Sequence, residues 1–333
     1  MSSLIAVTDA EATSALLFDR DEVEEVEDWL QAMGRLGRSS ILWIDLERRD
    51  EEDVRQLAEG LGLEESTAKV LSGPTGDPFF GDFGEYVHVT AYAPSAGSGM
   101  PHDLERVDCL VSKRWVATVH EREVPIVESF RERAGGSGET GRLDGLEFLA
   151  NLLDWVLEGY LDAFEEIEVA LEKLDARTME GGFDDPDEAL ADLVALRQEV
   201  GRLRRALVSH RRAFLSLTRP ELAGMSNERT AERFSDLRSR LEEVVQAARD
   251  SRDSVVGSFD VLIARTGHRT NEIMKVLTLA SVLLLPGALV AGVLGMNFKV
   301  GLFDHTELFW VVLAFIVTVA LATLAIARVR RWV

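Results

Sequence analysis

The sequence contains very few of the residues on which several protein classes depend. Its 333 residues include a single cysteine, Cys109, and 8 prolines. One cysteine cannot form an intramolecular disulfide, which excludes a disulfide scaffold and fits a reducing compartment. The low proline content excludes collagen-like and mucin-like chains. Basic residues are outnumbered, 36 against 58 acidic ones, and the net charge of −22 argues against a nucleic-acid partner, which requires clustered Lys and Arg.

Charge is missing altogether from two apolar segments near the C-terminus, residues 276–298 and 308–327. Twenty helical residues span about 30 Å, the thickness of the hydrocarbon core of a bilayer. We therefore expect transmembrane helices over 276–297 and 308–329, which makes the lipid bilayer a partner. The loop at 298–307, with Asp304 and Glu307, would be external. A buried hairpin in a soluble protein is the alternative.

Basic residues flank both expected spans on the same side. They are Arg265, Arg269 and Lys275 before the first span, and Arg328, Arg330 and Arg331 after the second. The positive-inside rule predicts a multi-pass protein of the plasma (inner) membrane with both termini in the cytoplasm. No basic segment followed by a long apolar stretch begins the chain, so we expect no signal peptide. Residues 1–270 carry a net charge of −24, so the cytoplasmic part is strongly acidic.

The first 133 residues mix strand and helix patterns. Segments rich in β-branched and aromatic residues predict strands over 40–46, 86–93, 106–112 and 115–120. The spacing of apolar residues predicts helices over 21–33 and 51–61. We expect an α+β cytoplasmic domain over residues 1–133, with a flexible joint at 134–141.

Only helical patterns follow the joint, which predicts a helical segment over 134–226. One long helix is expected over 143–174, and a second opens at Asp185 and Pro186 and ends near Leu217. A third begins near Asn227 and meets no proline before Pro286. A stalk helix over 227–275 would therefore continue into the first span without a break, and its heptad-spaced apolar residues require partner helices.

No catalytic motif is evident, so we expect no enzymatic activity and no organic cofactor. The sequence has no His-Glu-x-x-His, no cysteine pair and no serine elbow, and its six histidines are scattered. Residues 136–143 loosely mimic a phosphate-binding loop, but Arg142 stands where Lys is needed and Leu143 where a magnesium-binding hydroxyl is needed. A linker is the simpler interpretation.

The first span carries one stripe of polar, small or flexible residues at helical spacing. The stripe consists of Asn271, Met274, Thr278, Ser281, Leu285, Ala288 and Gly292. A helix-packing face is one interpretation. A pore lining is the other, and it requires an oligomer because two spans cannot enclose a water path. Met274 and Leu277 would then form rings able to block hydrated ions by dewetting. Neither span contains a carboxylate, which favours a hydrated cation such as Mg²⁺.

The end of this span carries the most specific motif, Gly295-Met296-Asn297. In this position, before a short loop and a final span, it resembles the CorA family of magnesium and divalent-cation channels. Residues 271–278 and 291–298 are similar to that family's pore helix, and residues 43–46 and 118–120 to its cytoplasmic domain. The resemblance implies a funnel-shaped homopentameric channel for uptake of Mg²⁺, with Co²⁺ and Ni²⁺ as further cations. It also implies stalk helices that continue into the pore and an external ring of Asn297 amides.

The chain also departs from the family pattern. Ala288 stands where many relatives have Thr, Leu294 stands where Tyr is common, and residues 298–308 replace a Met-Pro-Glu-Leu stretch. These differences leave the choice of cation open, so a zinc transporter that resembles ZntB is an alternative. A membrane-anchored sensor or scaffold is a third hypothesis, but an anchor needs neither the polar stripe nor the Gly-Met-Asn motif.

Acidic residues of the stalk are candidates for regulation. The resemblance implies that cytoplasmic Mg²⁺ between subunits holds the channel closed. Asp236 and Asp260 lie at similar distances from the pore helix as the family's acidic stalk residues. Asp253 and Asp260 are one heptad apart and so share a helix face. A solvated acidic surface is the simpler interpretation of such charges.

Overall fold

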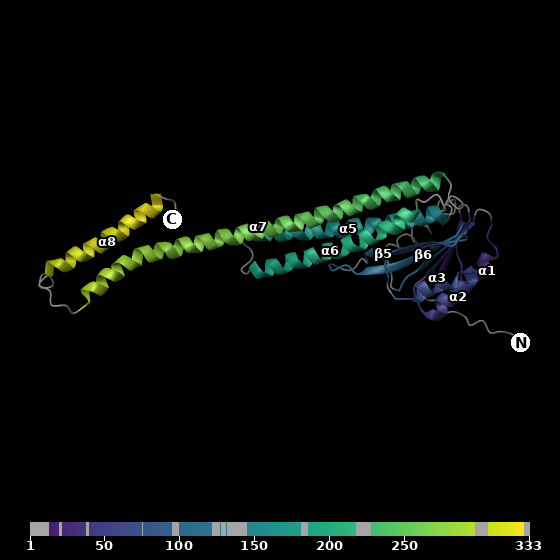
Figure 1. Ribbon diagram of the computed structural model, residues 1–333, viewed down its shortest axis with the longest axis horizontal. Coiled ribbons are helices and arrows are strands. Elements are labelled where there is room, and N and C mark those ends of the chain that lie inside the picture. Colours follow the sequence, from purple (N-terminus) through teal and green to yellow (C-terminus); the bar gives the residue numbers. More distant parts are fainter. Residues whose placement is uncertain are drawn as a thin grey trace. The chain divides into compact units, whose positions relative to one another are not determined.

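The computed structural model describes residues 13–19, 22–37, 40–74, 76–94, 100–121, 127, 131, 145–180, 186–217, 228–296 and 306–329. The chain divides into two compact units, Met1–Ser258 and Phe259–Val333. Figure 1 shows the helices and strands of both units.

The first unit contains a seven-stranded sheet with the strand order β2-β1-β3-β7-β6-β5-β4. The strands are β1 (Thr13–Asp19), β2 (Glu22–Glu25), β3 (Ser40–Leu46), β4 (Phe79–Asp82), β5 (Val87–Pro94), β6 (Leu104–Val111) and β7 (Trp115–Val119). Only β3 and β7 pair in parallel, with Leu42 opposite Trp115, and the other neighbours are antiparallel. The residues of β3 and β7 are buried throughout, as expected for strands covered on both faces.

Helices cover both faces of this sheet (Figure 1). Leu42, Ile44 and Leu46 point toward one face, where they share a core with α1 (Trp29–Met33), α2 (Glu51–Leu61) and α3 (Glu65–Ser72). The alternate residue Trp43 points the other way and contacts Phe148 of α5 (Gly145–Glu180), with the ring centroids 5.1 Å apart. This alternation follows from the two-residue period of a strand.

Two hydrogen bonds fasten the long helices to the backbone of Tyr92 in β5. The Tyr160 hydroxyl of α5 donates to the Tyr92 carbonyl at 2.8 Å, and the Tyr92 amide donates to Nε2 of His210 at 2.7 Å. His210 belongs to α6 (Pro186–Leu217), and burial lowers the pKa of its imidazole to about 4. The neutral ring can therefore act as an acceptor at this buried position.

The heptad-spaced apolar residues of α7 (Glu228–Leu294) find their partners within the chain. Those in the first unit are buried, among them Leu237, Leu241 and Val244. The Ser251 hydroxyl donates to Glu168 of α5 at 3.2 Å, and one heptad later Ser258 donates to Asp175 at 2.7 Å. These repeated contacts show that α5 and α7 run parallel, with the apolar face of α7 turned inward.

The expected helix over residues 21–33 is wrong in its first half. Residues Glu22–Glu25 form β2, which pairs with β1 in a tight hairpin, and only Trp29–Met33 is helical. Asp28 caps this short helix, because its Oδ1 accepts from the amide of Gln31 at 2.9 Å. The strands β1 and β4 and the helix α3 are further elements that the sequence patterns did not indicate.

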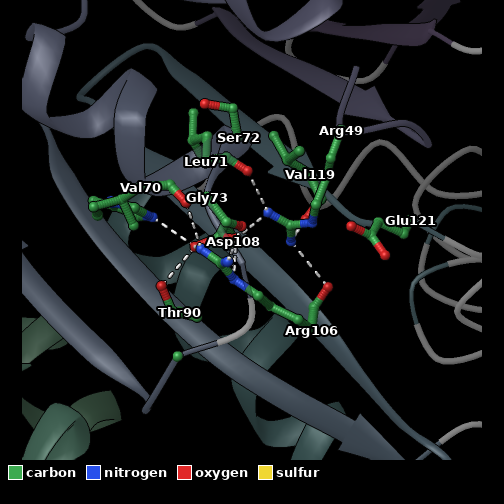
Figure 2. Close-up of polar contacts among 12 residues, drawn as sticks. Arg49, Val70, Leu71, Ser72, Gly73, Thr90, Arg106, Asp108, Val119 and Glu121 are labelled. Carbon is green, nitrogen blue, oxygen red and sulfur yellow. Dashed lines mark hydrogen bonds and ion pairs between the residues drawn. The ribbon is translucent and has the colours of Figure 1, made fainter. Parts of the chain in front are cut away.

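A buried charge cluster joins the strands to the loops around them (Figure 2). Asp108 of β6 is fully buried, and its carboxylate lies 2.6 Å from Nη1 of Arg49 and 2.9 Å from Nε of Arg106. His88 and Thr90 of β5 contact the same carboxylate, at 2.7 and 2.5 Å. A buried charge is tolerated only when it is paired and hydrogen-bonded, and each oxygen of Asp108 meets this condition.

The two arginines of the cluster also bind backbone carbonyls. Arg49 donates to the carbonyls of Leu71, Arg106 and Val119, and Arg106 donates to those of Val70, Gly73 and Pro74. One carboxylate thus holds in place two cations that fasten α3, the segment after it, β6 and β7. The cluster acts as a structural anchor of the sheet.

The second unit contains the remainder of α7 and the helix α8 (Thr306–Val329). Both helices have segments long and apolar enough to cross a membrane. In those segments only 0% and 6% of the residues are buried inside the protein. The core helix of a soluble protein would be mostly buried, so this finding favours membrane spans over a buried hairpin.

We predict that Asp108→Asn destabilises the protein by about 3 to 5 kcal/mol, because it leaves two buried arginines without their counter-charge. Thermal unfolding of the purified full chain would measure the loss. The exposed Asp77→Asn is the control and should leave the unfolding temperature nearly unchanged. An equal, small effect of both substitutions would show that the cluster contributes little to stability.

The same carboxylate predicts a pH dependence. Burial by itself raises the pKa of Asp108, but the hydrogen bond from His88 and the charges of His88, Arg49 and Arg106 outweigh it and lower the pKa to about 2. The ordinary value is 3.8, so the ionised carboxylate contributes stability above that pH, and the contribution is lost as the pH falls toward 2. In Asp108→Asn, acid unfolding should lack the part of the stability loss between pH 3.8 and 2 that comes from protonation of this carboxylate.

Candidate pore face

One face of the apolar part of α7 is covered. Its half-buried residues are Leu279, Leu283, Pro286, Gly287 and Val290, which recur at helical spacing. A Cβ atom placed on Gly287 would lie 3.4 Å from Cγ2 of Ile316 in α8. The half-buried residues of α8 also recur at helical spacing: Val312, Ile316, Val319, Ala320 and Thr323. The two helices therefore meet along one face of each, with Gly287 at a close approach.

The polar and small stripe lies on the opposite face of α7. All seven of its residues, Asn271, Met274, Thr278, Ser281, Leu285, Ala288 and Gly292, are exposed. With 3.6 residues per turn, the stripe lies about half a turn from the Leu283–Gly287 face. No atom outside the backbone of α7 lies within 4 Å of a Cβ built on Gly292 among the described residues. The stripe is thus not the α8-packing face.

The two hydroxyls of this stripe are oriented by the helix itself. Thr278 Oγ1 donates to the Met274 carbonyl at 2.7 Å, and Ser281 Oγ donates to the Leu277 carbonyl at 2.8 Å. Each hydroxyl has one proton, so its remaining capacity is to accept. These two hydroxyls can accept hydrogen bonds from the water shell of a cation.

The helix ends close to the Gly-Met-Asn motif. α7 ends at Leu294, and the amides of Gly295 and Met296 still bond to the carbonyls of Ala291 and Val293, at 2.9 and 3.3 Å. The Met296 side chain is exposed. Asn297 and Asp304 lie outside the described residues. Glu307 lies in the first turn of α8 instead of in the expected loop, because α8 begins at Thr306.

The acidic stalk residues do not form a metal site within one chain. Asp236, Asp253 and Asp260 are exposed. Asp236 lines a cavity of about 350 Å³ together with Asp154, but Arg233 and Arg240 line it as well, and Arg240 Nε lies 3.1 Å from Asp154. Among the residues that the structure describes, no group of three or more His, Cys, Asp or Glu could hold a metal ion.

The histidines at strand positions are packed residues. His88 is bonded to Asp108 as described above, and His120 Nε2 lies 3.2 Å from Asp45 Oδ1, with both groups buried. The Asp108 cluster was missed by the sequence analysis, although an aspartate inside the apolar strand Leu104–Val111 is a signal that could have revealed it.

Comparisons with known proteins point to one family. The family model described as "CorA-like Mg2+ transporter protein" matches residues 38–331. The cobalt/magnesium transport protein CorA of Thermotoga maritima is 25% identical over 240 residues, which cover 69% of this chain and 66% of that protein. The magnesium transport protein CorA of Salmonella typhimurium is 27% identical over 287 residues, covering 84% and 85%.

A solved structure shows the same fold. The complete structure of the CorA magnesium transporter from Methanocaldococcus jannaschii matches with a TM-score of 0.78 and 18% identity, and the match covers 100% of both chains. Because the family model spans nearly the whole sequence, the chain belongs to the family of CorA-like Mg²⁺ transporter proteins, whose members transport ions and are not enzymes.

Proposed function

We propose that the protein forms a channel that carries Mg²⁺ across the plasma membrane, with several copies of α7 around one ion path. The observation that carries this proposal is the exposed polar and small face of α7, which lies opposite its contact with α8. The Mg²⁺ transport named for relatives from Thermotoga and Salmonella agrees with it. Basic residues on the cytoplasmic side of both spans would place both termini in the cytoplasm.

The ion path requires a homo-oligomer, and the CorA resemblance supports five subunits. Two helices cannot surround water, but a ring of identical chains with closed symmetry can. In such a ring the stripe from Asn271 to Gly292 would face the axis, and α8 would lie outside against lipid. The Gly295-Met296-Asn297 motif would then form the outer end of the path.

The chemistry of this face suits a hydrated divalent cation. Mg²⁺ loses its water slowly, so groups that accept hydrogen bonds from its water shell allow faster passage than groups that must replace it. Thr278 and Ser281 offer such acceptors, and the amide carbonyls of five Asn297 residues would do so at the entrance. Asp304 and Glu307 would raise the local cation concentration, an effect that salt weakens.

Cytoplasmic Mg²⁺ would regulate the channel through the acidic stalk. Asp236, Asp253 and Asp260 are exposed, and residues 1–270 carry a net charge of −24. Mutual repulsion between several copies favours separation of the stalks. Mg²⁺ that binds between copies would draw them together, because an ion shifts the equilibrium toward the state that it binds better.

Purified protein in liposomes should conduct Mg²⁺, with weaker flux of Co²⁺ and Ni²⁺, and native mass spectrometry should show five copies. Fluorescent indicators for each cation measure the flux, and empty liposomes provide the background. Flux of Zn²⁺ without flux of Mg²⁺ would favour the zinc transporter. A stable monomer would contradict the pore.

Two glycines of α7 distinguish the pore face from the packing face. Gly292→Val should leave the thermal stability of the assembly unchanged, because the added atoms meet open space, and should lower Mg²⁺ flux by narrowing the path. Gly287→Val should instead lower stability, because the new side chain crowds Ile316. Both substitutions make the same chemical change in the same helix. If the two variants lost the same Mg²⁺ flux and had the same thermal stability, the distinction between a pore face and a packing face would fail.

A third substitution addresses the gate. Met274→Gly should raise Mg²⁺ flux about tenfold or more when Mg²⁺ is present on the cytoplasmic side, because it removes a ring that excludes water. Val276→Gly also places a glycine in the helix, at a cost of up to about 1 kcal/mol, and lies off the stripe, so its flux should stay low. If both variants leak equally, the effect comes from helix disruption and not from a gate at Met274.

A further inference from the structure

A groove of about 1120 Å³ between α5 and α6 is lined mainly by basic residues, although the cytoplasmic part as a whole is acidic. Five basic side chains line it: Lys173 and Arg177 from α5, and Arg197, Arg202 and Arg205 from α6. Its acidic lining residues are Asp192 and Glu199. Residues 1–270 carry a net charge of −24, so a concentration of positive charge at one concave surface is unexpected from composition alone.

On each of the two helices, the basic residues lie on one face. Lys173 and Arg177 are four residues apart on α5, and Arg197 and Arg205 are eight apart on α6, so each pair lies on one helix face. Lys173, Arg197 and Arg205 form no ion pair with a carboxylate of the described residues. Like charges around one groove repel each other, and a bound anion would relieve that repulsion.

The acid of the groove floor is already neutralised. Glu199 is buried, and its Oε2 lies 2.8 Å from Nη2 of Arg202. Its Oε1 accepts from the backbone amide of His102 at 2.9 Å. Nε2 of His102 lies 3.1 Å from Glu166 of α5. These contacts fix the segment before β6 against both helices. Arg177 Nη2 lies 3.8 Å from Oε1 of Glu188. Glu199 leaves the charge of Lys173, Arg197 and Arg205 uncompensated.

The groove also has an apolar wall. Met100 and Pro101 lie next to the fixed His102, and Val194 and Leu196 line the groove from α6. Ligand sites for small organic molecules measure about 300 to 1,000 Å³, so this groove is far larger than inorganic phosphate requires. The guanidinium fork of arginine matches the oxygens of a phosphate group.

We propose that this groove binds a nucleoside polyphosphate, with the phosphates among Lys173, Arg177, Arg197 and Arg205 and the base against the Met100–Pro101 wall. Such a ligand combines the multiple negative charge and the flat apolar surface that the lining residues accommodate. The site belongs wholly to the first unit. Its occupation is independent of whether the chain conducts Mg²⁺.

Calorimetric titration of the full chain in detergent with ATP, in buffer without divalent cations, tests the proposal. ATP should bind the wild type, and Arg197→Glu/Arg205→Glu should weaken binding at least about tenfold. The control Arg204→Glu/Arg212→Glu makes the same charge change on α6 outside the groove lining, and should change affinity by no more than about twofold, since salt screens distant charges. Arg197→Gln/Arg205→Gln repeats the test without charge reversal and should also weaken binding.

Inorganic triphosphate separates the two parts of the proposal. ATP should bind about tenfold more tightly than triphosphate if the apolar wall holds the base. Equal affinity of the two would overturn the nucleoside assignment. Absence of ATP binding, or an equal loss in the groove variants and the control, would overturn the site itself.

Discussion

The contact of α8 with one face of α7 leaves the opposite face without a partner among the described residues of the chain, and the functional account depends on this asymmetry. In a bilayer, a helix satisfies its own backbone but gains nothing by exposing hydroxyls and amides to lipid. Apolar side chains such as Leu283 meet α8 or lipid equally well. The stripe that contains Asn271, Thr278 and Ser281 carries polar groups, which water inside the proposed assembly would hydrate.

The first unit supplies a rigid start for the same helix. Asp108 holds two arginines that fasten β6 and β7 to their surrounding loops, and Tyr92 of the same sheet receives both α5 and α6. α5 in turn bonds to α7 at positions one heptad apart, through Ser251 and Ser258. These contacts turn the apolar face of α7 inward within that unit, and its acidic residues, Asp236 and Asp253, remain exposed.

The elements that the sequence predicted well are those whose signal is local and repeated. The expected start of α6 at Pro186 and the long course of α7 follow from capping and periodicity, and the structure confirms both. The prediction of a helix over 21–33 was wrong in its first half, because the apolar spacing there is compatible with a helix or a strand. Only pairing with β1 makes Glu22–Glu25 a strand. The partner of the heptads was equally hidden, since periodicity reveals that a face is buried and not what covers it.

The candidate site also has parts that the sequence predicts and parts that it does not. The stripe from Asn271 to Gly292 could be listed from helical spacing, but its position opposite Gly287 required the contact with Ile316. An aspartate inside an apolar strand signals a buried charge at Asp108, but its partners Arg49, Arg106 and His88 could not be anticipated, because they are distant in the chain. The basic groove could not be anticipated either, because Lys173 and Arg205 meet only after folding. The Asn297 ring remains a prediction from the family resemblance.

A cysteine scan along α7 tests the central claim most directly. The sole native thiol, Cys109, is buried, and burial raises its pKa, so it contributes little background reaction. Single cysteines at positions 278, 281, 288 and 292, and at 279, 283, 287 and 290 for comparison, would be treated with a charged, water-soluble thiol reagent during Mg²⁺ flux. The account predicts rapid modification and block at the first set, and slow modification without block at the second. Equal reactivity of both sets, or block confined to the second, would contradict a water-filled path along this face.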